Sequence, residues 1–70
     1  MAAEVHAAGA GMIIIRADST HDRRSRAAEI NAARRAFERD TGTRLALVAK
    51  SYSETYGFLS RSEFRYRAVS

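Results

Sequence analysis

The chain has 70 residues, a formal net charge of +4, a sequence pI near 10.3 and no cysteine. This length excludes more than one domain, and the lack of cysteine excludes disulfides and thiolate metal sites. Since 14 residues are alanine, the large apolar side chains are few and the core is thin, so we consider a homodimer or a larger assembly.

Residues 1–11 are mostly alanine and glycine, a composition typical of a flexible N-terminal tail. Residues 12–70 would then form a single small α+β domain. The N-terminus lacks the basic region and the long apolar stretch of a signal peptide. No run approaches the roughly 18 apolar residues of a membrane-spanning helix. We therefore expect a cytoplasmic protein that makes no membrane contact.

Residues 12–18, MIIIRAD, predict a strand, and the three consecutive isoleucines favour a central strand that is covered on both faces. A helix is predicted over residues 21–40, because this segment is rich in alanine, arginine and glutamate. Ser19 is the expected N-cap, with Asp22 three residues later in a capping-box-like pair. Gly42 is expected to end the helix in the left-handed conformation.

The predicted helix has two rows of apolar residues. The row expected to face the sheet consists of Ile30, Ala33 and Phe37. The second row consists of Ala28, Ala32 and Ala36. Alanine is a common helix filler, but a row of small residues also allows close helix–helix contact, so both interpretations of the second row stay open.

Two further strands are predicted over residues 44–52 and 58–69, joined by a polar turn at residues 53–57. These two strands should pair antiparallel. The predicted fold is therefore α+β with the order β-α-β-β, in which one helix packs on a three-stranded sheet. The crossover through the helix should place the first strand beside a parallel partner.

The last predicted strand, FLSRSEFRYRAV, alternates in character. Its even positions carry aromatic rings that should meet the helix, at Phe58, Phe64 and Tyr66. Its odd positions carry charged side chains that should point outward, at Arg61, Glu63, Arg65 and Arg67. A shift of one residue would bury the arginines, so the register should be firmly set.

The segment SRSEF, residues 60–64, resembles the start of the second helix in ribbon-helix-helix repressors. The resemblance covers only these five residues, and the chain has no room for the helix that must precede them, so we reject the family. It does raise an alternative for the last segment, in which Ser60 caps a short helix over residues 61–68.

The sequence offers little for catalysis, and we expect no enzyme, no cofactor and no metal. Its two histidines, His6 and His21, have no obvious catalytic partner, and no histidine or carboxylate cluster has metal-ligand spacing. A nuclease built on Asp18 and Asp22 is conceivable. Carboxylates at a strand-to-helix joint, however, more often cap the helix.

Eleven of the twelve basic residues are arginine, whose planar guanidinium matches phosphate and carboxylate. Three groups stand out. One is on the last strand and consists of Arg61, Arg65 and Arg67. One is at the helix start and consists of Arg23, Arg24 and Arg26. One is later in the helix and consists of Arg34, Arg35 and Arg39, with Glu38 placed to pair with Arg34.

We therefore predict a small non-catalytic module that docks an arginine-rich surface on an anionic partner, with nucleic acid, contacted through its phosphates, as the first candidate. The first two groups are the predicted contact residues. The alternative is a small inhibitor or adaptor, of the kind that phages and mobile elements encode, that blocks a host protein or nucleoprotein complex. An anti-CRISPR or a regulator blocker would have this size. Its partner would have an acidic surface, with Tyr52 and Tyr56 as anchors.

Overall fold

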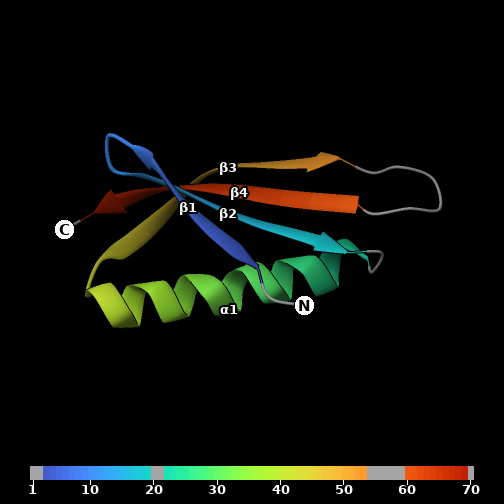
Figure 1. Ribbon diagram of the computed structural model, residues 1–70, viewed down its shortest axis with the longest axis horizontal. Coiled ribbons are helices and arrows are strands. Elements are labelled where there is room, and N and C mark those ends of the chain that lie inside the picture. The colour runs from blue at the N-terminus through green and yellow to red at the C-terminus, as the bar shows by residue number, and fades with distance from the viewer. Residues whose placement is uncertain (1–2, 20–21, 54–59, 70) are drawn as a thin grey trace.

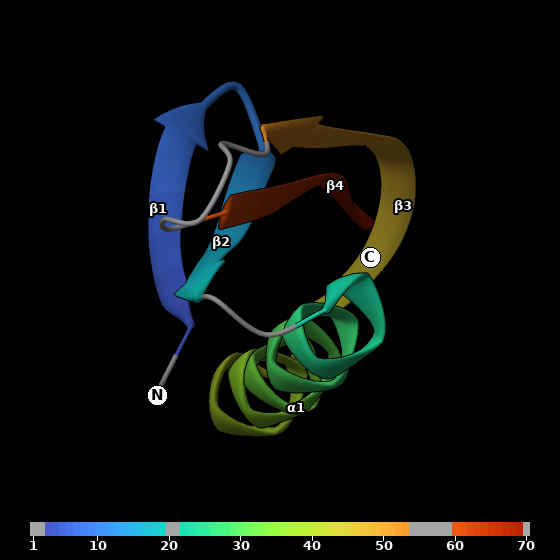
Figure 2. The same ribbon diagram turned by 90° about the vertical axis from the view of Figure 1, so that its right-hand side faces the viewer.

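The computed structural model describes residues 3–19, 22–53 and 60–69. It contains four strands and one helix (Figure 1). In chain order they are β1 (Glu4–Gly9), β2 (Met12–Ser19), α1 (Arg23–Thr41), β3 (Arg44–Ser53) and β4 (Ser60–Val69). Helix α1 lies along one face of the sheet (Figures 1 and 2). The predicted α+β class is confirmed.

The strand order is β1-β2-β4-β3, and every neighbouring pair is antiparallel. The predicted three-stranded sheet, with the first strand beside a parallel partner, was therefore wrong. Strands β2 and β3 do run in the same direction, but β4 lies between them. The return of β4 from β3 lets it pair antiparallel on both of its sides, which is slightly more stable per residue than parallel pairing.

The prediction of a flexible tail over residues 1–11 was also wrong, because Glu4–Gly9 form strand β1. This strand pairs with β2, and Gly9, Ala10 and Gly11 form the turn with positive φ angles. Without β1, the polar backbone groups along one side of β2 would have no strand partner. The first strand is therefore held by backbone pairing, since all six of its residues are exposed.

Helix α1 begins one residue after Asp22, whose carboxylate accepts a hydrogen bond from the backbone N–H of Ser25 at 2.8 Å. Asp22 is thus the N-cap. The prediction of Ser19 was wrong, because β2 continues through that residue. Gly42 ends the helix with φ of 70° and donates its N–H to the carbonyl of Glu38, as predicted.

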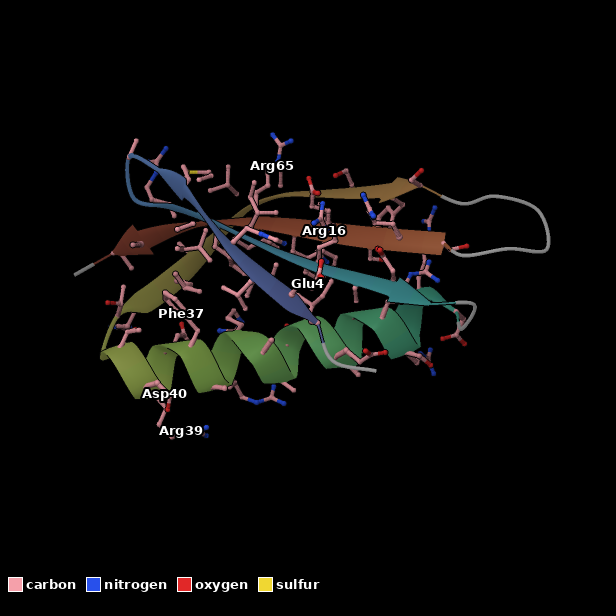
Figure 3. The ribbon with its side chains drawn as sticks, viewed as in Figure 1. Glu4, Arg16, Phe37, Arg39, Asp40 and Arg65 are labelled. Atoms are coloured by element: carbon pink, nitrogen blue, oxygen red, sulfur yellow. The ribbon has the colours of Figure 1, made fainter. Side chains whose placement is uncertain are left out.

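The core lies between α1 and the inner face of the sheet. Ile15 and Ile30 are fully buried, and Phe37 packs against this cluster between α1 and the strands (Figure 3). Residues 60–69 form strand β4, so the alternative of a short helix over residues 61–68 was wrong. On this strand Phe64 and Tyr66 are buried, as predicted. Phe58, the third ring predicted to face the helix, lies outside the described residues, as does most of the polar turn predicted at residues 53–57.

Strand β2 is central, as predicted, but a helix covers only one of its faces. Ile13 and Ile15 point inward and are buried, whereas Ile14 between them is only half-buried. Among the described residues, no helix packs on the opposite face of the sheet, which we call the outer face.

Candidate site on the outer face of the sheet

Strands β2 and β4 supply the centre of the outer face. Because successive residues of a strand point to opposite sides, the burial of Phe64 and Tyr66 turns Arg61, Arg65 and Arg67 outward, and all three are exposed. Figure 3 shows Arg65 pointing away from α1. The predicted outward direction of these arginines is confirmed.

Arg61 is held by a carboxylate on the neighbouring strand. Its Nε donates to one oxygen of Asp18 at 2.7 Å and its Nη2 donates to the other at 2.9 Å. The hydrogen bond from Arg61 lowers the pKa of Asp18 below its ordinary value, although burial opposes this. A bidentate pair of this kind fixes the guanidinium plane, so Arg61 already has its anion within the chain.

A second ion pair lies beside this one. Arg16 contacts Glu4 of β1 at 3.3 Å, and the two side chains meet over the outer face in Figure 3. Arg16 also lies 3.0 Å from the ring of His6 and stands directly opposite Glu63 of β4. We call this half of the outer face the paired end. It comprises Glu4, Arg16, Asp18, Arg61 and Glu63.

The other half of the outer face carries arginines that have few contacts with carboxylates. Arg65 makes one long contact of 3.6 Å with Glu63 and remains 54% exposed. Within residues 3–19, 22–53 and 60–69, no hydrogen bond or ion pair involves the side chain of Arg67 or of Arg44. Arg44 stands opposite Val69 in the ladder, which makes it a diagonal neighbour of Arg67. We call Arg44, Arg65 and Arg67 the open end.

The cross-strand neighbours of the open end are uncharged. Arg67 lies between Met12 and Ala46, and Arg65 lies between Ile14 and Ala49. With no carboxylate directly opposite either arginine, the positive potential of the open end is not neutralised locally. Such a surface favours an anionic partner.

The basic group predicted at the helix start is divided by the fold. Arg23 and Arg24 are exposed, and the guanidinium carbon of Arg23 lies 3.9 Å from the ring centre of Tyr52. Arg26 is only 1% exposed, and its Nε donates to the hydroxyl of Ser62 at 2.8 Å. Arg26 therefore supports the core and does not belong to an exposed basic surface, contrary to the prediction.

The third basic group lies on α1. Arg34 pairs with Glu38 at 3.2 Å, as the spacing predicted, while Arg39 contacts Asp40 at 3.5 Å. Figure 3 shows Arg39 and Asp40 on the far side of α1, opposite the side on which Arg65 points. Arg35 is also exposed. The helix cations and the open end thus cannot contact one flat surface together.

Of the two tyrosines predicted to anchor a protein partner, Tyr52 lies among the described residues. Tyr52 is 39% exposed on β3, and its ring stands edge-on to Phe64 with 6.4 Å between ring centres. Tyr56 lies outside the described residues.

The described part of the chain lacks metal-binding clusters and membrane-spanning helices. It contains no group of three or more histidine or acidic residues that could hold a metal ion. Within the same residues, no helix has the length and apolar character needed to cross a bilayer. His6 lies on β1 beside Arg16, and His21 lies outside the described residues.

No protein-family profile, no curated protein and no solved structure matches this chain.

Sequence reasoning missed Arg44 of the open end, and it missed both Arg16 and Glu4 of the paired end. Arg44 begins its strand one residue before the buried Leu45, so alternation along that strand already placed it outward. Arg16 follows the three isoleucines at a position of the same parity as Ile14. Its partner could not be found, because β1 had been interpreted as a tail.

Proposed function

We propose that this protein is a small non-catalytic binding module whose open end docks on the phosphate backbone of a nucleic acid. The observation that carries the proposal is the contrast within one exposed face. Arg61 and Arg16 are engaged by carboxylates, whereas Arg44 and Arg67 have no such partner in the described structure and Arg65 has only a long one. Guanidinium groups with free donors bind phosphate oxygens well.

The proposed contacts reach the backbone rather than the bases. Stacking on bases requires exposed aromatic rings, and Phe64 and Tyr66 are both buried on the inner face. Binding through phosphates alone carries little sequence information. We therefore expect similar affinity for oligonucleotides of unrelated sequence, and a steep loss of affinity as the salt concentration rises.

The test is fluorescence anisotropy with mixed-sequence single- and double-stranded oligonucleotides at about 50 and about 200 mM salt. We expect micromolar binding at the lower salt that weakens steeply at the higher one. Absence of binding at the lower salt would sink the proposal.

Two double variants locate the binding surface. R65Q/R67Q removes two cations from the open end, and R24Q/R35Q removes two exposed cations from α1, so both lower the net charge from +4 to +2. The first should weaken binding roughly 10-fold or more and reduce the salt slope by about 2, and the second should weaken it only slightly. The opposite ranking would place the site on the helix.

A second candidate function is an inhibitor or adaptor that binds a host protein. It is favoured by the apolar side chains that edge strand β3 exposes, since Leu47 is 49% and Val48 is 51% exposed. A protein partner with apolar side chains would cover such exposed apolar groups, whereas a phosphate backbone would not. A pull-down from nuclease-treated host lysate tests this candidate, because a nucleic-acid tether would not survive the treatment.

A further inference from the structure

Helix α1 packs mainly on β2 and β4, and it leaves much of the inner side of β3 uncovered. Figure 2 shows β3 at one edge of the sheet, bending along its course. Between α1 and β3 lies a groove of about 220 Å³. Its lining residues are Ala27, Asn31, Arg34, Leu45, Leu47, Lys50, Phe64 and Tyr66.

The floor of this groove is apolar. Leu45, Phe64 and Tyr66 are buried beneath it, and Leu47 stands half-exposed within it. Burial raises the pKa of the Tyr66 hydroxyl, which therefore stays neutral at physiological pH. An occupant with apolar side chains would cover Leu47, which a phosphate backbone does not do.

The rim of the groove is positive. The ammonium of Lys50 lies 5.1 Å from the ring centre of Phe64, and next to it Arg23 lies over Tyr52. On the helix side stands Arg34. Glu38 also lies near this rim and is already engaged, since it accepts from Arg34 and from the backbone N–H of Leu45 at 2.8 Å.

We infer that this groove, which we call the β3 groove, docks an acidic segment of a protein partner that carries apolar side chains. The apolar side chains would cover Leu47, and the carboxylates would meet the positive rim at Lys50. The inference rests on the second candidate function, to which it gives a site and a partner chemistry. The β3 groove lies on the opposite side of the sheet from the open end, so the two surfaces can be tested separately.

The probe is an acetylated hexapeptide in which one leucine and one phenylalanine are flanked on each side by two glutamates. It is titrated into the ¹⁵N-labelled full chain and followed by amide chemical shifts. We expect saturable shifts at Leu47, Lys50 and Asn31 at roughly millimolar peptide or below. A peptide with glutamine for each glutamate, and one with serine for both apolar residues, should each bind several-fold more weakly.

Matched variants test the apolar floor and the positive rim of the β3 groove separately. Leu47→Ser should weaken peptide binding several-fold, while Val5→Ser, a comparably exposed change on the opposite edge strand, should leave it unchanged. Lys50→Gln should weaken it, and Arg35→Gln, which removes the same charge from the exposed side of α1, should not.

Three results would overturn the inference: no shifts at roughly millimolar peptide, equal binding of the glutamine peptide, or shifts concentrated at Arg65 and Arg67. The last result would mean that the acidic peptide binds the open end through electrostatic attraction alone and does not bind the β3 groove. The R65Q/R67Q variant separates the proposals, because it should weaken oligonucleotide binding roughly 10-fold or more and leave peptide binding unchanged.

Discussion

The two ends of the outer face have similar arginine content and opposite electrostatic character. At the paired end, Arg61 and Arg16 each meet a carboxylate on a neighbouring strand. At the open end, the neighbours of Arg65 and Arg67 on the adjacent strands are alanine, methionine and isoleucine. The comparison shows that the number of arginines on a face does not define a binding surface, since cross-strand partners decide which guanidinium groups remain available.

The inner face beneath the paired end follows the same pattern. Ser62, which lies between Arg61 and Glu63 on β4, accepts from the buried Arg26. Arginines at this end of the molecule are therefore engaged within the chain, whereas those of the open end have long contacts or none among the described residues.

The largest expected effect comes from breaking the buried contact under the paired end. Ser62→Ala removes the acceptor of the Arg26 Nε–H, and a buried donor that loses its acceptor costs about 1–3 kcal/mol of unfolding free energy. Urea unfolding measures this loss. Ser51→Ala on the exposed part of β3 is the control and should stay within about 0.5 kcal/mol of the wild type. Equal stability of the two variants would show that the Arg26 contact contributes little.

The next effect comes from making the open end resemble the paired end. Ala46→Glu with Ala49→Glu places carboxylates directly opposite Arg67 and Arg65. Oligonucleotide affinity, measured by anisotropy at low salt, should fall roughly 10-fold.

The control for this change is Ser51→Glu with Ser53→Glu, which adds the same two charges to the same strand opposite the paired residues Glu63 and Arg61. We expect it to lower oligonucleotide affinity only about 2- to 3-fold, because the added carboxylates repel the phosphates from a distance. Equal losses in both variants would show that net charge, not the open end, governs binding.

A smaller effect should follow from opening the paired end. Asp18→Asn removes the anion that holds Arg61, so oligonucleotide affinity should rise roughly 2- to 3-fold and the salt slope should steepen by about 1. Because the pair is partly exposed, the stability cost should stay below about 1 kcal/mol. An unchanged salt slope would indicate that Arg61 does not reach the ligand even when released.

The smallest effect concerns pH. Arg61 holds the pKa of Asp18 below its ordinary value of 3.8, so this carboxyl stabilises the fold above that pH and loses its contribution as the pH falls through its lower folded pKa. Urea unfolding between about pH 5 and about pH 2 should therefore show a weaker acid dependence in Asp18→Asn than in the wild type.

Some acid dependence should remain in that variant. The backbone N–H of Ser25 lowers the pKa of Asp22 in the same direction. An acid dependence identical to that of the wild type would contradict a stabilising role for the Asp18–Arg61 pair.

Local patterns predicted the elements whose side chains alternate or repeat strongly. The composition of residues 21–40 predicted helix α1, and Gly42 predicted where that helix ends. The alternation of side chains along β4 predicted that its arginines point outward. Strand β1 was missed because all six of its residues are exposed and it is held by backbone pairing with β2. The glycine-rich turn at residues 9–11 before MIII was the available hairpin signal.

Strand order and burial of Arg26 were harder to predict. The order depends on whether β4 or β3 lies beside β2, which no local pattern encodes. Arg26 lies four residues before the buried Ile30, so the apolar stripe of α1 extends to it. Its charge suggested the surface, whereas the hydroxyl of Ser62, distant in sequence, supplies a buried acceptor.

The most direct test of the open end is an NMR titration that follows the Nε–Hε signals of the arginine side chains as a mixed-sequence oligonucleotide is added at low salt. We predict that the signals of Arg44, Arg65 and Arg67 shift first, while those of Arg26 and Arg61 stay in place. Shifts led by the helix cations Arg24, Arg35 and Arg39, or equal shifts in both groups, would contradict this prediction.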